Sequence, residues 1–148
     1  MSLNLKIDDT GLKRKMAEVK KAVDPAKMLD GVRQKFLRDI DKNFKSQGQE
    51  LSGGWAKLSP RTIRARRNKS SRAIRILQDT GRLRQSFFGV SGSSQMVVRT
   101  NDIRASRLND GKSSQHLPGR RMIHTKEQAK KSAIRLLDAF IKKRIRNG

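Results

Sequence analysis

Few residues in this sequence have the types and spacing that catalysis requires. His116 and His124 are the only histidines, and a zinc site or a Ser-His-Asp site needs a histidine held among further partners. The adjacent carboxylates Asp8 and Asp9 could hold a metal ion in a small nuclease, although a strand end followed by a helix cap explains them better. Ser52-Gly53-Gly54 lacks the lysine and the spacing of a phosphate-binding loop. We therefore expect no enzyme, no cofactor and no metal site.

Positive charge is the strongest chemical signal in the chain. The formal net charge is +23, which favours binding to a polyanion or to an acidic protein surface. The densest basic run contains no acidic residue and consists of Arg61, Arg64, Arg66, Arg67, Lys69, Arg72 and Arg75. A second basic group is expected on the outer face of the last helix and consists of Lys130, Lys131, Arg135, Lys142, Lys143, Arg144 and Arg146.

The basic run from Arg61 to Arg75 leaves three interpretations open. A solvated helix face normally mixes both signs of charge, so contact with phosphates or with an acidic protein is favoured over simple solvation. The run contains no aromatic side chain, and Trp55 stands only at its edge. Because base stacking needs aromatic side chains, we expect any nucleic-acid contact to be made with the backbone of a duplex.

Hydrophobic periodicity predicts two long helices. The first runs from Pro25 to Lys45, and the last, capped by Thr125, spans about 125–146. The apolar stripe of the first helix consists of Met28, Leu29, Val32, Phe36, Leu37, Ile40 and Phe44. The stripe of the last helix consists of Ala129, Ala133, Leu136, Leu137, Phe140, Ile141 and Ile145. We expect these stripes to form most of the core.

Shorter elements are predicted from alternation and from capping residues. Residues 3–7 alternate as a strand does, and a helix is expected from about 12 to 23. Ser59-Pro60 marks the start of a short helix that ends near Arg67. Residues 86–91 and 95–100 predict a β-hairpin.

Turns and loops separate these elements. Asp79-Thr80-Gly81 predicts a turn before a short helical segment, and the polar, glycine-rich residues 47–54 predict a loop. The longest loop is expected over 101–120, which is polar and rich in Gly, Ser and Asn. Loops of that length in a compact domain are usually functional or flexible.

The order of strand, helices, hairpin and helix indicates a single α+β domain over residues 1–148. We expect a small, mostly antiparallel sheet packed by long amphipathic helices. The absence of cysteine excludes disulfides and thiolate metal sites. No apolar run approaches the roughly 20 residues of a membrane span, and the N-terminus lacks the apolar segment of a signal peptide. We therefore expect a soluble protein made in the cytosol, without a membrane partner.

The order of several residues across most of the chain resembles a known family. A helix ending in Phe44 leads into a glycine-rich loop, and Leu117-Pro118-Gly119-Arg120 precedes the last helix. Between them stand Trp55, Leu58, Thr62, Leu77, Thr80, Gly81, Leu83 and Ser86. This pattern resembles the phage virion morphogenesis family, the tail-completion and head–tail joining proteins of tailed phages. That family has Pro and an aromatic residue after the arginine, whereas Arg121 and Met122 stand here.

The resemblance implies a structural protein of the phage neck with an α+β fold and no catalytic activity. It implies a homo-oligomeric ring of six or twelve copies around the DNA channel, between the head connector or portal and the tail proteins. The protein would be assembled in the host cytoplasm and found in the virion. The resemblance also places Trp55, Pro118 and Arg120 in a structural motif. Trp55 is expected to anchor its loop to the core, and Thr80-Gly81 to form a tight cap.

Two other functions remain open on the sequence alone. A nonspecific nucleic-acid-binding protein of ribosomal or nucleoid type would use the same cations and would bind in a salt-dependent manner. A small metal nuclease would need Asp8 or Asp9 and magnesium. If the protein is a neck component, its basic surface meets either packaged DNA or the acidic surfaces of neighbouring proteins.

Overall fold

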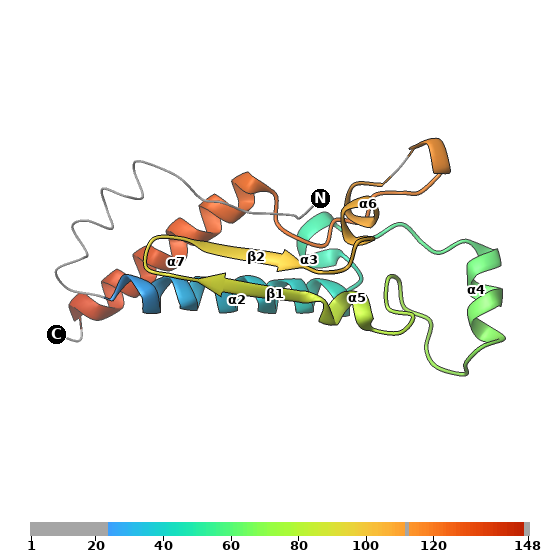
Figure 1. The fold of residues 1–148 in the computed structure, drawn as a ribbon, viewed down its shortest axis with the longest axis horizontal. Coiled ribbons are helices and arrows are strands. Elements are labelled where there is room, and N and C mark those ends of the chain that lie inside the picture. The colour runs from blue at the N-terminus through green and yellow to red at the C-terminus, as the bar shows by residue number, and fades with distance from the viewer. Residues whose placement is uncertain (1–23, 112, 147–148) are drawn as a thin grey trace. The chain divides into compact units, whose positions relative to one another are not determined.

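Helices and one antiparallel hairpin form the regular structure of residues 24–111 and 113–146, which the computed structural model describes. The elements in chain order are α2 (Pro25–Lys45), α3 (Gln49–Ser52), α4 (Pro60–Arg67), α5 (Arg82–Gln85), β1 (Phe87–Ser91), β2 (Met96–Thr100), α6 (Ala105–Asp110), the 3-10 turn η1 (Ser113–Gln115) and α7 (Lys126–Arg146) (Figure 1). The fold is α+β, as the sequence predicts.

The chain divides into two compact units. Within the described residues, the first unit comprises 38–87 and 100–123, and the second comprises 24–37, 88–99 and 124–146. Helix α2 contributes residues to both, because the division falls between Leu37 and Arg38. The prediction of a single domain over the whole chain stays a prediction.

The second unit is built from the first part of α2, the hairpin and α7. Its buried side chains come from all three elements and are Met28, Leu29, Val32, Phe36, Met96, Val98, Ala129, Ala133 and Leu137. Gly31 allows α7 to approach α2 closely, because a Cβ atom at this position would lie 2.8 Å from Cζ of Phe140. Small residues at a helix contact let the two backbones come together, which explains why Ala129 and Ala133 are buried there.

The hairpin of the second unit lies alongside α2 (Figure 1). The N–H of Gly92 donates to the carbonyl of Gln95 at 2.9 Å and closes the turn between β1 and β2. The Ser91 hydroxyl donates to Asp30 Oδ1 at 3.2 Å and fixes the end of β1 to the helix. Side chains alternate across a strand, so Phe88 and Val90 share the outer face and remain 44 % and 59 % exposed.

The first unit has a smaller apolar core. Its buried hydrophobic residues are Ile40, Phe44, Trp55, Leu83, Ala105 and Met122. Two of them come from the last turns of α2, and the others come from separate loops and short helices. Because so few apolar residues are available, hydrogen bonds must fix much of this unit.

Most sequence predictions of elements are confirmed. Helix α2 has the predicted bounds, and the hairpin forms where expected. Ser59 caps α4, since its side chain accepts from the Thr62 N–H at 3.2 Å, and Pro60 is the first helical residue. Thr125 caps α7 by accepting from the N–H of Gln128 at 3.2 Å, while Gln128 Oε1 accepts from the N–H of Thr125.

Two predicted loops are wrong in part, because each contains a short helix. Residues 47–54 include α3, and residues 101–120 include α6 and η1. The polar composition of these segments concealed the helices, since their stability comes from tertiary contacts rather than from an apolar stripe. In α6 a single small side chain, Ala105, is buried. The strand and helix predicted at 3–7 and 12–23 lie outside the described residues.

Candidate functional site

The C-terminal end of α2 is the point at which the first unit is held together. The last carbonyl groups of a helix have no partner within the helix. Here the carbonyl of Asn43 accepts from the N–H of Gly48 at 2.8 Å, and that of Phe44 accepts from Gln78 Nε2 at 2.7 Å. Gln47 accepts from the N–H of Ile76 at 3.1 Å through Oε1. The distant segment 76–78 and the loop that follows α2 are thereby fixed to one helix end.

Asn43 is the central polar residue of this network, and its side chain is fully buried. Its Nδ2 donates to the carbonyl of Arg121 at 2.9 Å, and its Oδ1 accepts from the N–H of Leu51 at 3.2 Å. This role is not among the sequence predictions. The available signal was its spacing, three residues after Ile40 and seven after Phe36, which places an amide on the apolar stripe of α2.

Trp55 packs on the same helix end and is only 7 % exposed. Its ring meets Phe44 edge to face, with centroids 5.1 Å apart. Its Nε1–H donates to the carbonyl of Arg121 at 2.9 Å, so this carbonyl receives both Asn43 and Trp55. Gly48 has φ +95°, and a Cβ atom there would collide with the indole. The predicted anchoring of the glycine-rich loop by Trp55 fits these contacts.

Arg120 fixes the segment that follows Trp55. The residue is 6 % exposed, and its guanidinium donates through Nε to the carbonyl of Ala56 at 3.2 Å. Burial, with a further contribution from the positive charge of Arg66, lowers the pKa of Arg120 below its ordinary value. Among the described residues Arg120 has no carboxylate partner in an ion pair, so its role here is to bind backbone carbonyls.

Arg121 and Met122, the two departures from the pattern noted in the sequence, contribute backbone groups to the network. Arg121 contributes its carbonyl, which any residue could supply, and its side chain is exposed. Met122 is buried, and its N–H donates to Asn109 Oδ1 at 2.8 Å. The departures therefore leave the network intact.

Four of the other motif residues, Thr62, Gly81, Leu83 and Ser86, lie at the starts of α4 and α5 or support them locally. Gly81 has φ +78° and precedes α5, and Leu83 is buried. Ser86 donates to the carbonyl of Leu83 at 2.8 Å and also pairs with the Thr100 hydroxyl. Thr62 pairs with the Ser59 hydroxyl at the start of α4. The remaining motif residues are half-buried at Leu58 and Leu77 and exposed at Thr80 and Pro118.

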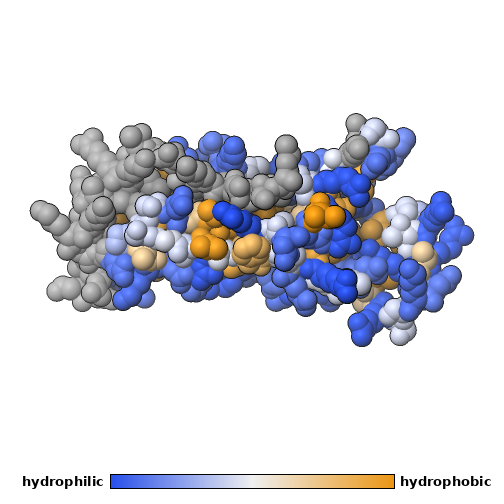
Figure 2. Space-filling model, viewed as in Figure 1, coloured by the Kyte–Doolittle hydropathy of each residue, from blue (hydrophilic) through white to orange (hydrophobic). Residues whose placement is uncertain are grey.

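The basic run divides into one structural arginine and six exposed cations. Arg66 donates through Nη1 to the carbonyl of Arg75 at 2.7 Å and lies 3.6 Å from Asp79 Oδ1, with its side chain 19 % exposed. The exposed cations are Arg61, Arg64, Arg67, Lys69, Arg72 and Arg75. None of these six forms an ion pair with any residue that the structure describes. Figure 2 shows hydrophilic surface over most of the region of α4 on the face in view.

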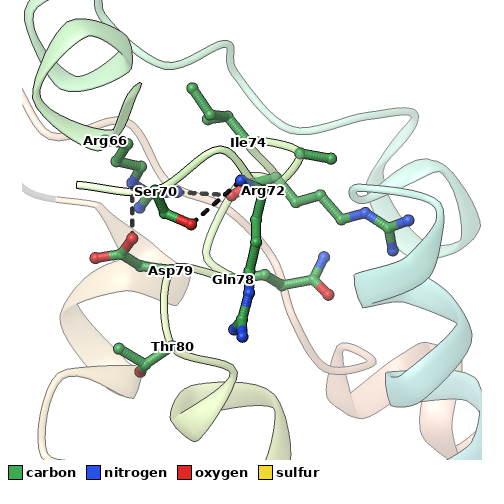
Figure 3. A pocket seen from close by; sticks show the side chains of 9 residues that line it. Arg66, Ser70, Arg72, Ile74, Gln78, Asp79 and Thr80 are labelled. Atoms are coloured by element: carbon green, nitrogen blue, oxygen red, sulfur yellow. Dashed lines mark hydrogen bonds and ion pairs between the residues drawn. The ribbon is translucent and has the colours of Figure 1, made fainter. Parts of the chain in front are cut away.

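A polar hollow of about 280 Å³ lies between the loop after α4 and residues 78–80. Figure 3 shows the side chains that line it, with dashed lines that join Arg66 to Asp79 and Ser70 to Arg72. Arg75 also lines this hollow, and a second hollow of about 490 Å³ shares Arg72, Arg75 and Thr80. Three arginines from one short segment therefore border a single polar depression.

The second basic group lies on α7 in the other unit. Lys131, Arg135, Lys142, Lys143 and Arg146 are exposed, whereas Lys130 is half-buried and makes an interaction of its own. The two basic groups therefore belong to different units and are treated as separate surfaces.

Within the part of the chain that the structure describes, the residues considered for catalysis are not gathered into a site. His124 packs edge to face on Phe36, with ring centroids 5.0 Å apart, and His116 is exposed. No group of three metal-ligating side chains occurs among residues 24–111 and 113–146. Asp8 and Asp9 lie outside the described residues. In the same part of the chain, no helix combines the length and apolar composition that a bilayer crossing requires.

Comparisons with known proteins return no match: no family model, no curated protein and no solved structure is similar to this chain at a significant level.

Proposed function

We propose that the chain is a structural protein of the phage neck, which completes the tail and joins it to the head connector as a ring around the DNA channel. The proposal starts from the resemblance in the order of Trp55, Thr80-Gly81 and Arg120. Under this proposal the protein is a structural component of the particle and catalyses no reaction. Its partners would be further copies of itself, connector and tail proteins, and the packaged DNA.

One observation carries this proposal: four of the motif residues, Trp55, Gly81, Ser86 and Arg120, serve structure. Trp55 and Arg120 contact backbone carbonyls that come from distant segments, and Gly81 and Ser86 support α5. A network of internal hydrogen bonds of this kind suits a structural protein that connects two assemblies. It leaves the cations of α4 and the following loop available to a partner.

The experiment that tests the proposal compares two substitutions at Trp55 in the phage whose genome encodes this chain. Trp55→Phe keeps an aromatic ring on Phe44, and we expect infectious particles. Trp55→Ala removes the ring, and we expect electron micrographs to show filled heads and complete tails that are not joined. Normal numbers of joined particles with Trp55→Ala would contradict the proposed role of the motif.

A second candidate is a nonspecific nucleic-acid-binding protein of ribosomal or nucleoid type. The six exposed cations without carboxylate partners favour it, since such a surface attracts phosphates without reading sequence. This candidate predicts that the protein is found on host nucleic acid in infected or uninfected cells. Co-sedimentation with heads, tails or whole particles distinguishes the neck protein from this alternative.

A further inference from the structure

We infer that the hollow bordered by Arg72 and Arg75 is a phosphate site that takes the backbone of double-stranded DNA. The inference deepens the proposed function and rests on it only for the source of the DNA, the packaged genome. Binding itself can be measured on the isolated chain.

The balance of charge around the two connected hollows favours an anion. Asp79 is paired with Arg66 at 3.6 Å, and Asp41 is paired with Arg84 and with Lys45 at 2.8 Å. The carboxylates that line the hollows are thus already neutralised. Arg72 and Arg75 have no such partner among the described residues, so the depression carries two uncompensated guanidinium groups.

Neutral hydrogen-bond donors lie at the same place. The Ser70 hydroxyl accepts from the N–H of Arg72 at 3.2 Å, which leaves its own proton free to donate. The Thr80 hydroxyl is exposed and has no partner among the described residues. Two guanidinium groups with two hydroxyls match the several acceptor oxygens of a phosphate.

The size and the potential of the hollow also suit a phosphate. Its volume of about 280 Å³ leaves room for a phosphate group with part of its hydration shell. Arg66, on its wall, lies close enough to the buried Arg120 to contribute to the lowered pKa of that residue.

The composition of the segment favours a phosphate backbone over an acidic protein. Arginine outnumbers lysine six to one between Arg61 and Arg75, and the planar guanidinium suits bidentate contact with phosphate. Protein interfaces usually carry aromatic anchors, and this segment has none. The nearby Trp55 is buried against Phe44, so it cannot stack on a base. Binding should therefore follow the backbone and ignore the sequence.

The test is a fluorescence-anisotropy titration of a labelled duplex of mixed sequence with the full chain, from about 50 to about 200 mM salt. The Arg72→Gln/Arg75→Gln double variant should bind about tenfold or more weakly. Its log–log salt dependence should be shallower by about two units, one for each phosphate that is no longer neutralised. The matched control is Arg38→Gln/Arg107→Gln, which removes two exposed arginines of the same unit. The control should change affinity by less than about threefold.

Equal losses in the two double variants would overturn the site, because the binding would then follow total charge alone. Unchanged binding in Arg72→Gln/Arg75→Gln would overturn it as well. Arg72→Lys/Arg75→Lys keeps the charge and should retain most of the salt dependence. A lysine pair whose salt dependence is as shallow as that of the glutamine pair would show that charge at these two positions does not neutralise phosphates, and would also overturn the assignment.

A competition experiment distinguishes DNA from an acidic protein as the ligand of this site. Polyglutamate of equal charge should displace the labelled duplex less well than unlabelled duplex does. If polyglutamate competes better, and does so through Arg72 and Arg75, the site is for an acidic protein and the phosphate assignment is wrong. A negative result in the binding assay contradicts the phosphate site but not the proposed role in the phage neck. Absence of the chain from phage particles contradicts the role in the neck but not the measured binding of DNA.

Discussion

The network at the end of α2 and the basic run from Arg61 to Arg75 belong to the same unit but use polar groups in opposite ways. In the network, Asn43, Trp55 and Arg120 find their partners inside the protein. Among the described residues no buried side-chain nitrogen or oxygen lacks a hydrogen-bond partner. In the run, six cations remain exposed and have no carboxylate partner there. Groups paired internally fix the shape, and groups left unpaired are available to a ligand.

The largest expected effect comes from removing Trp55. Trp55→Ala should lower the free energy of unfolding by about 3–5 kcal/mol, because it leaves a cavity against Phe44 and removes a donor from the Arg121 carbonyl. Trp55→Phe should cost about 1–2 kcal/mol, since Asn43 still donates to that carbonyl. Urea denaturation of both variants measures the difference. A loss below about 1 kcal/mol for the alanine variant would contradict the anchoring role.

Substitution of Asn43 should cause the second-largest loss of stability. Asn43→Ala leaves the N–H of Leu51 without its side-chain acceptor and removes a donor from Arg121, so about 2–3 kcal/mol of stability should be lost. The control is Asn101→Ala, an exposed amide, for which the change should stay within about 0.5 kcal/mol. Equal values for the two asparagines, measured by the same denaturation, would mean that the buried amide does not organise the unit.

Residues of the two regions differ in how well the sequence predicts them. The apolar stripe of α2 and the cap at Ser59 follow from spacing and residue type alone. Both were predicted correctly, except that Leu37 of the stripe is only half-buried. Asn43 was not predicted, because its partners Leu51 and Arg121 lie 8 and 78 positions away. The same limit applies to Arg66, which is one of six arginines between Arg61 and Arg75 but is held by Asp79 in the fold. Long-range partners of polar groups are set by packing and cannot be read from local pattern.

Arg66 belongs to the basic run in sequence but is paired inside the protein, so its substitution tests the distinction between paired and exposed cations. Arg66→Gln should cost about 1 kcal/mol, because it removes the bond to the carbonyl of Arg75 and the ion pair with Asp79. Arg67→Gln, its exposed neighbour, should leave the unfolding free energy within about 0.5 kcal/mol of the parent. If thermal melts show the two variants to be alike, Arg66 belongs with the exposed cations and the division between the two regions is wrong.

The smallest effect is the dependence of stability on pH through Asp41. Hydrogen bonding to Lys45, and next to Arg84, lowers the pKa of Asp41 below its ordinary value of 3.8, although burial partly opposes this. A carboxylate with a lowered pKa in the folded state stabilises the fold above its unfolded-state pKa, and this contribution is lost as pH falls further. The side chain is 39 % exposed, so the contribution should stay below about 1 kcal/mol.

The check is a series of melts between neutral pH and about pH 3. Asp41→Asn should flatten the loss of stability below about pH 4. Glu50→Gln, at an exposed position without a partner among the described residues, should leave the parent slope largely in place. An unchanged slope for Asp41→Asn would show that its pairing with Arg84 and Lys45 contributes nothing measurable.

The most direct test of the central claim is a reconstruction of purified tailed particles from the phage whose genome carries this sequence. The proposal predicts a closed ring of copies of this chain where head meets tail, with Trp55 inside each subunit and residues 61–75 turned toward DNA. Particles that are complete and infectious but contain no copy of the chain would contradict it.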